Sequence, residues 1–201
     1  MFTGIVRELG TVVSVNERAD GRAIVVRAPE TAAPTNRGDS VSISGCCLTA
    51  AAVDGEEISF HAVPETLART TLRQLQADDG VNVESSVRAG EPLGGGYVQG
   101  HVDGVGHVQS VEAEGEGLRV FIEAPDDVLR YCVEKGSVTI DGVSLTVAEL
   151  ADDAFAVALV PHTLEATTLS QLAPGQEVNL EADVLAKYVE RLLPRGQTRD
   201  V

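Results

Sequence analysis

The sequence predicts a mainly β protein, in which a small closed β-barrel of five or six strands is built twice in tandem and followed by one α-helix. Three observations predict this fold class. Residues 38–87 align without a gap on residues 135–184, and about twenty of the fifty positions are identical. Each copy consists of short β-branched or alternating runs between Gly, Asp, Asn and Pro, a pattern typical of strands and turns. The last segment is amphipathic at helical spacing and has no counterpart in the first copy.

The repeat has an offset of 97 residues and defines two domains. It extends upstream with an offset of 96, which places residues 1–6 on residues 97–102. A period of this length is the size of a small domain, far longer than a solenoid unit. Between the copies lies the segment RAGEPLGGG, residues 88–96, whose Gly and Pro content is typical of a linker. We therefore expect one domain over residues 1–96 and a second over residues 97–201.

Within each copy the pattern is mostly strand with two short helices. In the first copy the expected strands are Thr11–Val15, Ala23–Arg27, Ser40–Ser44, Ile58–Ala62 and Gly80–Glu84. Closure into a barrel is expected because it removes exposed strand edges. One helix is expected near Ala32–Arg37 and, in the second copy, near Asp126–Cys132. The other is expected to begin at Thr66 and at Thr163, each just after a turn that contains a proline.

The segment Val184–Leu193 predicts an amphipathic helix. Asp183 is a suitable N-cap, and Pro194 follows the last helical residue. Apolar residues recur at helical spacing along one face, with charged residues opposite. This apolar face is expected to be buried against another surface. Two alternatives remain: the helix packs on its own barrel, or it contacts another subunit.

Composition and charge exclude several classes of protein. The formal net charge of −16 without a basic patch argues against nucleic-acid binding. The longest apolar runs have five or six residues, too few to span a membrane, and the start of the chain lacks a signal-peptide pattern. Three cysteines, of which Cys46 and Cys47 are adjacent, form neither a disulfide framework nor, with four scattered histidines, a zinc motif. We expect no metal and a reducing cytoplasm. The acidity indicates a solvated surface, or alternatively a salty habitat.

Two equivalent domains predict two equivalent pockets, lined by the segments most alike in both copies. These are the GxxLT motifs (45–49 and 142–146), the strands that enter VPxTL (61–67 and 158–164) and the GxV segments (4–6 and 100–102). An alternative is that they are only turn glycines and barrel core. The hydroxyls of Thr49, Thr66, Thr146 and Thr163, which occur in both copies, favour a pocket, because a buried hydroxyl needs a partner that a polar heterocycle can supply.

The positions at which the copies differ suggest different chemistry in the two pockets. Cys47 aligns with Ser144, Cys46 with Val143, His101 with Ile5, Lys135 with Gly38, and His162 with Glu65. Two similar pockets would bind two copies of one ligand, and unlike reactive groups would make one copy a donor and the other an acceptor. Drift after a gene duplication is the alternative explanation.

Six segments together resemble the riboflavin synthase family, alpha-chain type. They are MFTGIVRELG, SGCCLT, GYVQGHVDGVG, DGVSLTV, VPHTLEATTL and NLEADVLAKYVERLL. The resemblance covers Met1 to Leu193 in family order. It implies two similar six-stranded antiparallel barrels of Greek-key type plus a C-terminal helix, through which three chains form a homotrimer. The tail from Pro194 is unmatched, and we expect it to be disordered.

The resemblance also implies the reaction and the site. Two molecules of 6,7-dimethyl-8-ribityllumazine become riboflavin and 5-amino-6-ribitylaminouracil by transfer of a four-carbon unit, without a cofactor, in the last step of riboflavin biosynthesis. The reacting pair is expected between the N-terminal barrel of one subunit and the C-terminal barrel of its neighbour. By family pattern Ser40, Cys47 and His101 belong to the N-terminal pocket, and Lys135 and Ser144 to the C-terminal one. We expect His101 to transfer protons, Ser40 and Cys47 to polarise or add to one ring, and Lys135 and Ser144 to orient the other.

The remaining expectations concern substrate binding and the partners. The expected substrate-binding residues are Gly4, Ile5, Val6, Cys47, Leu48, Thr49, His61, Ala62, Val63, Pro64, Glu65, Thr66, Gly100, His101, Val102, Lys135, Ser144, Leu145, Thr146, Ala158, Leu159, Val160, Pro161, His162 and Thr163. Gly96 stands where the family usually has histidine. Association with lumazine synthase is left open. The rival function is that of a lumazine protein, which holds a lumazine or flavin without converting it.

Overall fold

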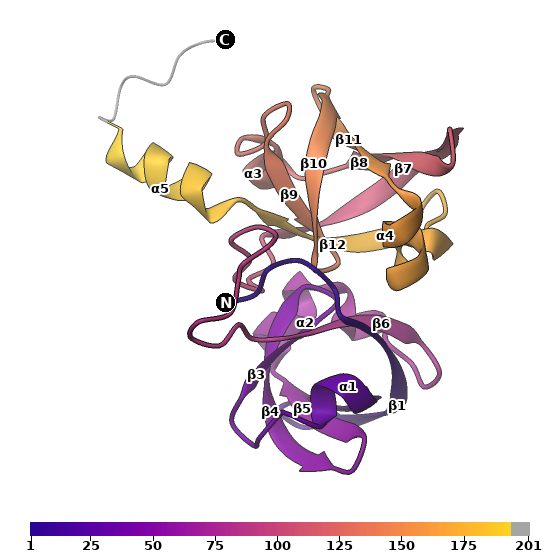
Figure 1. The fold of residues 1–201 in the computed structure, drawn as a ribbon, viewed down its shortest axis with the longest axis vertical. Helices are drawn as coiled ribbons and strands as arrows, with labels where there is room; N and C mark the ends of the chain where they lie inside the picture. The colour runs from indigo at the N-terminus through magenta and orange to yellow at the C-terminus, as the bar shows by residue number, and fades with distance from the viewer. Residues whose placement is uncertain (194–201) are drawn as a thin grey trace.

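The computed structural model describes residues 1–193 and consists of two closed six-stranded antiparallel barrels followed by a helix (Figure 1). The N-terminal barrel comprises β1 (Glu8–Arg18), β2 (Gly21–Arg27), α1 (Pro29–Ala32), β3 (Ser40–Ile43), β4 (Cys46–Asp54), β5 (Glu57–Ala62), α2 (Pro64–Arg69) and β6 (Gly80–Ser85). The C-terminal part comprises β7 (Gly104–Glu114), β8 (Gly117–Glu123), α3 (Asp126–Leu129), β9 (Ser137–Ile140), β10 (Val143–Leu150), β11 (Ala154–Leu159), α4 (Pro161–Ala166), β12 (Glu177–Ala182) and α5 (Val184–Leu192). The disorder expected from Pro194 onward concerns residues outside the described range.

Both barrels have the same strand order, which confirms the predicted tandem duplication. The order is β1-β2-β5-β4-β3-β6 in the first barrel, and the second closes in the same cycle. Because β5 rather than β3 neighbours β2, the connection is of Greek-key type. Register shifts occur in β1 between Val12 and Ser14 and in β7 between Val108 and Ser110. Such bulges bend a strand and increase its twist, so the halves share their curvature as well as their order.

Each barrel encloses its own apolar core. In β5 the residues Ile58, Phe60 and Ala62 are buried, and the residues between them are less so. This alternation follows from the period of two along a strand. In β11 the buried run is nearly continuous and includes Phe155. Two separate clusters of buried side chains fill the barrels, so each barrel has a core of its own.

Three local expectations were wrong. The first copy has a sixth strand, β4, which begins at Cys46 within the GxxLT segment and is missing from the five expected ones; Gly45, which precedes it, is a turn residue with a φ of +80°. The helix expected near Ala32–Arg37 is α1, which lies earlier because Pro29 occupies its first turn, where the fixed backbone of proline is favourable. For the same reason α2 begins at Pro64 and α4 at Pro161 rather than at the threonines that follow.

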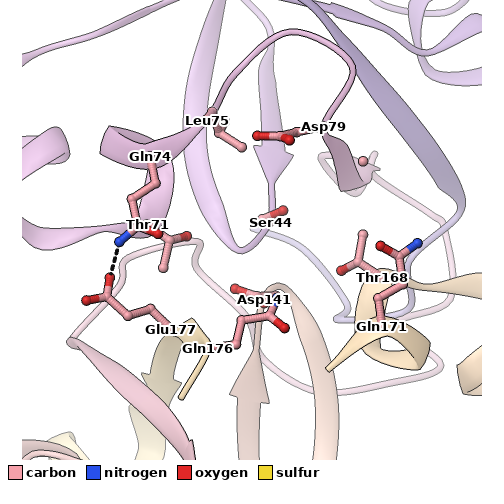
Figure 2. A pocket seen from close by; sticks show the side chains of 11 residues that line it. Ser44, Thr71, Gln74, Leu75, Asp79, Asp141, Thr168, Gln171, Gln176 and Glu177 are labelled. Carbon is pink, nitrogen blue, oxygen red and sulfur yellow. Dashed lines mark hydrogen bonds between the residues drawn. The ribbon is translucent and has the colours of Figure 1, made fainter. Parts of the chain in front are cut away.

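The barrels are joined by a reciprocal exchange of two asparagines. Asn82 of β6 donates from Nδ2 to the carbonyl of Asp141, and Asn179 of β12 donates from Nδ2 to the carbonyl of Ser44, both at 2.8 Å. The side-chain oxygen of each asparagine accepts the first backbone N–H of a 3₁₀ helix in the opposite barrel, again at 2.8 Å. Beside this contact lies a cleft of about 270 Å³, which side chains of both barrels line (Figure 2).

Helix α5 extends away from the barrels (Figure 1). The side chain of Asp183 accepts from Leu185 N at 2.9 Å, as expected of an N-cap. Polar contacts attach the helix to the C-terminal barrel: Lys187 pairs with Asp103, and Glu190 bonds to Arg130 and Tyr131. Its apolar residues are exposed, Leu192 to 82%, so the helix does not bury its apolar face on its own barrel. Among residues 1–193, every helix is too short or too polar to cross a bilayer.

Candidate functional site

The segments that precede the two barrels, residues 1–6 and 97–102, are exchanged between the halves; we call them the leading segments. They pair with each other through two backbone hydrogen bonds between Phe2 and Val98, of 2.7 and 3.2 Å. Val6 packs against the core of the C-terminal barrel, and Val102 against that of the N-terminal barrel. Each candidate pocket is therefore built from one barrel and the leading segment of the other half.

The exchange brings Cys47 and His101 together. The amide of Cys47, on β4, donates to the carbonyl of Gly100 at 2.8 Å. A cleft of about 180 Å³ opens here, which we call the Cys47 cleft. Its lining residues are Cys46, Cys47, Glu65, Thr66, Arg69, Thr70, Gly100, His101 and Val102. Six of these nine were expected to bind substrate; Cys46, Arg69 and Thr70 were not.

Arg69 and Thr70 line this cleft from the end of α2. The hydroxyl of Thr70 donates to the carbonyl of Thr66 at 2.7 Å and accepts from Leu72 N at 3.3 Å. This fixes the turn that closes one side of the cleft. The sequence could have indicated Thr70 as a site residue, because Thr70 and Leu72 align with the identical residues Thr167 and Leu169 in the second copy. Arg69 differs between the copies, so the repeat gave no sign of its position.

The equivalent place on the C-terminal barrel combines Ser144 with the N-terminus of the chain. The amide of Ser144, on β10, donates to the carbonyl of Gly4 at 2.9 Å, as Cys47 does to Gly100. The linker also reaches this point, since a Cβ placed on Gly96 would lie 2.8 Å from Ser144 Oγ. A side chain at position 96 would therefore contact Ser144 directly, and glycine leaves the space beside the Ser144 hydroxyl open.

Of the two adjacent cysteines, Cys47 is the one suited to chemistry. Cys46 points into the barrel core, and burial raises the pKa of its thiol to about 12. A thiol with that pKa stays protonated at neutral pH and is a poor nucleophile. Cys47 is half-buried and lines the cleft beside the exposed His101. An imidazole and a thiol thus lie at the same opening.

Two buried carboxylates, which the sequence analysis did not single out, hold the leading segments. Glu84 accepts from the amide and hydroxyl of Thr3, both at 2.7 Å, and from Gly4 N at 3.1 Å. Glu181 accepts from three consecutive amides, those of Gln99, Gly100 and His101. Both glutamates occupy the same place in the repeat, which is the signal that could have found them.

The other expected catalytic residues lie on the outer faces of the barrels. Ser40 stands on β3 opposite Thr49, on the face shared with Cys47. Lys135 precedes β9 with a φ of +66°, a conformation that is unfavourable for a residue with a side chain. Its ammonium donates to the carbonyl of Ala148 at 3.3 Å. Neither Ser40 nor Lys135 lines the Cys47 cleft in the described part of the chain.

Several expected substrate-binding residues do not line the Cys47 cleft. Leu48, Ala62 and Leu159 are buried in the barrel cores. His61 lies 3.5 Å from Asp20 and outside the residues that line the Cys47 cleft. Val63, Ala158 and Val160, together with Pro64, Pro161 and His162, are exposed next to α2 or α4. Within residues 1–193 no group of three or more His, Cys, Asp or Glu side chains has a geometry that could hold a metal ion.

Comparison with known proteins identifies the family. The lumazine binding domain family matches residues 3–86 and again residues 99–183. Riboflavin synthase of Mycobacterium tuberculosis is 44% identical over 198 residues, which cover 96% of this chain and 98% of the relative. The chain belongs to the riboflavin synthase family. Riboflavin synthase of Bacillus subtilis is 33% identical and covers 98% of this chain and 91% of its own length. As a member of this family the chain is an enzyme of the transferase class.

Solved structures show the same fold. The crystal structure of LumP complexed with 6,7-dimethyl-8-(1'-D-ribityl) lumazine superposes with a TM-score of 0.82 and 27% identity, covering 90% of this chain and 99% of LumP. The complex of LumP with riboflavin gives a TM-score of 0.84, also at 27% identity. The two-barrel fold of the riboflavin synthase family is therefore shared with a lumazine-bound protein.

Proposed function

We propose that this chain is a riboflavin synthase, which converts two molecules of 6,7-dimethyl-8-ribityllumazine into riboflavin and 5-amino-6-ribitylaminouracil. The observation that carries the proposal is the pair of related but chemically different half-sites. One combines Cys47 with Gly100 and His101, and the other combines Ser144 with Gly4 and Ile5. Each half of the chain, 1–96 and 97–201, contributes one barrel to bind one lumazine.

The residues present suit a dismutation of one substrate by another copy of itself. The 7-methyl group of the lumazine is acidic because its carbanion delocalises into the ring, so one copy becomes the nucleophile after losing a proton. His101 takes and returns protons at the Cys47 cleft. Cys47 and Ser40 polarise one ring, while Lys135 and Ser144 orient the other. Holding both rings in contact removes the entropic cost of a bimolecular encounter, which accounts for a large part of the acceleration.

Incubation of the purified chain with 6,7-dimethyl-8-ribityllumazine is expected to produce flavin absorbance. His101→Ala should lower kcat by about 10²–10⁴-fold, the range for loss of a general acid–base group. The matched control is His107→Ala, because His107 lies on β7 beside Glu177 and outside the Cys47 cleft. Full turnover by the His101 variant would remove His101 from proton transfer.

The second candidate function is binding without conversion, which the structural likeness to lumazine-bound LumP favours. Under this alternative the wild-type chain would bind the lumazine tightly, as seen by a change in its fluorescence, and would form no flavin. The presence of both Cys47 and His101 at one cleft supports the enzyme. The same incubation therefore separates the two functions.

We also propose that the active form is a homotrimer held by α5. Its apolar residues Leu185, Tyr188, Val189 and Leu192 are exposed and form a continuous face that nothing within residues 1–193 covers, and burial of such a face drives association. The N-terminal barrel of one subunit and the C-terminal barrel of the next would then present their two lumazines to each other. Lumazine synthase remains a candidate further partner.

Leu192→Asp is expected to dissociate the trimer, since it places a charge on the apolar face of the proposed contact, at its most exposed leucine. Light scattering after gel filtration should then give the mass of one chain in place of three. Arg191→Asp is the control: it alters charge more strongly but lies on the polar side of the same helix. A trimer that survives Leu192→Asp would exclude this helix as the contact.

A further inference from the structure

Glu181 of β12 makes an unusual set of contacts with the leading segment that carries His101. Its Oε1 accepts from Gln99 N at 2.7 Å, and its Oε2 accepts from Gly100 N at 2.8 Å and from His101 N at 3.1 Å. The side chain belongs to the C-terminal barrel, whereas the segment that it holds crosses to the Cys47 cleft of the N-terminal barrel. One carboxylate of the C-terminal barrel thus binds the segment that passes from one barrel to the other.

The carboxylate is held at an electrostatic cost. Glu181 is 3% exposed, and burial raises its pKa, an effect that the amides of Gln99 and Gly100 and the charge of Lys187 oppose. Hydrogen bonds to an ionised acceptor are roughly twice as strong as neutral ones. Three convergent amides also restrict the backbone dihedrals of consecutive residues. The position of the His101 backbone, from which its side chain extends, follows from that restriction.

We propose that Glu181 is a positioning residue of the active site, which acts through the backbone of residues 99–101 to place His101 beside Cys47. Two contacts define that placement: Glu181 holds the segment from one side, and Cys47 N bonds to the Gly100 carbonyl at 2.8 Å from the other. The inference rests on the proposed function, in which His101 transfers protons.

The chain contains a matched control for this role. Glu84 occupies the same place in the N-terminal barrel, is 4% exposed, and also accepts three hydrogen bonds from a leading segment. That segment, however, carries Gly4 to Ser144 and does not include His101. Replacing either glutamate by glutamine puts an amide N–H₂ against backbone donors and breaks an equivalent set of contacts. The two variants should therefore lose similar stability but affect different half-sites.

The test is a double-mutant cycle on kcat. Glu181→Gln is expected to lower kcat by about 10–100-fold in the wild-type background, because displacement of a catalytic group by about 1 Å has an effect of that order. In the His101→Ala background the same substitution should lower kcat by no more than about twofold, since coupled residues are not additive. Glu84→Gln should lower kcat by the same factor in both backgrounds. A Glu181→Gln effect that is equally large with and without His101 would overturn the proposal.

Amide hydrogen exchange provides a readout that does not depend on turnover. Protection of the Gln99, Gly100 and His101 amides should be lower in Glu181→Gln, because glutamine has one acceptor oxygen in place of two, and retained in Glu84→Gln. Retained protection in Glu181→Gln would also overturn the proposal. If the wild-type chain forms no flavin, the proposed function fails. Binding of riboflavin then replaces kcat in the cycle, and a Glu181→Gln effect independent of His101 would again refute the positioning role.

Discussion

Gly45→Ala is expected to destabilise the protein by several kcal/mol. Gly45 has a φ of +80°, and a Cβ there would lie 2.6 Å from the backbone nitrogen of Gly142, its partner across the barrel–barrel contact. The left-handed conformation costs alanine about 1–2 kcal/mol, and overpacking adds about 1–3 kcal/mol. The new Cβ is fixed to the backbone of residue 45, and the atom that it meets is the backbone nitrogen of Gly142. Neither atom can rotate away, so relief of the clash requires the two barrels to separate.

Gly55→Ala is the matched control for this prediction. Gly55 also has a positive φ, of +59°, but a Cβ there would have no neighbour within 4 Å. It therefore carries only the conformational cost. Urea denaturation of both variants should give a lower midpoint for Gly45→Ala, and its free energy of unfolding should be lower by at least the overpacking contribution of about 1 kcal/mol. Equal midpoints would mean that the barrels move apart freely and that the close contact at Gly45 is not required.

Asp141→Asn is expected to stabilise the protein above neutral pH. Asp141 lines the cleft between the barrels (Figure 2) and is 8% exposed, and burial raises its pKa from 3.8 to about 7. The unfolded chain releases this proton near pH 4, whereas the folded chain keeps it until about pH 7. The free energy of unfolding of the wild-type protein therefore falls as pH rises from about 4 to about 7. A shift of about 3 units corresponds to about 4 kcal/mol at most.

The variant retains the contacts of the wild type. Asn179 N donates to Asp141 Oδ1 at 2.8 Å, and the amide oxygen of asparagine can accept the same bond. The difference in unfolding free energy between Asp141→Asn and wild type should grow from pH 4 to pH 7 and stay constant above. Asp79→Asn, a half-buried carboxylate of the same cleft, is the control. A difference that is independent of pH would show that Asp141 is ionised throughout the window.

The duplicated barrel could be predicted because its determinants are local. Alternating apolar residues such as Ile58 and Phe60 define strands by periodicity, and the repeat makes each half support the prediction for the other. The helix over Val184–Leu192 followed from its cap and spacing. The boundaries of α1 and α2 were less predictable, because Pro29 and Pro64 begin a helix as readily as they end a turn.

The site was only partly predictable for a different reason. Cys47 and His101 could be selected because the two copies differ there, but the repeat alone does not say which barrel receives which leading segment. A chain in which each leading segment stays on its own barrel and one in which the segments are exchanged would have the same repeat pattern. Glu84 and Glu181 were likewise visible as repeated residues, yet nothing local distinguishes a buried acceptor from a solvated acid on a strand.

The sequence by itself determined the strand pattern, the duplication, the final helix and the residue types available for chemistry, since these depend on periodicity and comparison along the chain. Only the tertiary structure decided that residues 1–6 and 97–102 exchange barrels, that Glu181 holds His101 beside the Cys47 cleft, and that Asp141 is buried between the halves. These features depend on contacts between residues about 40 to 140 positions apart, and their energies arise from burial that no local pattern records.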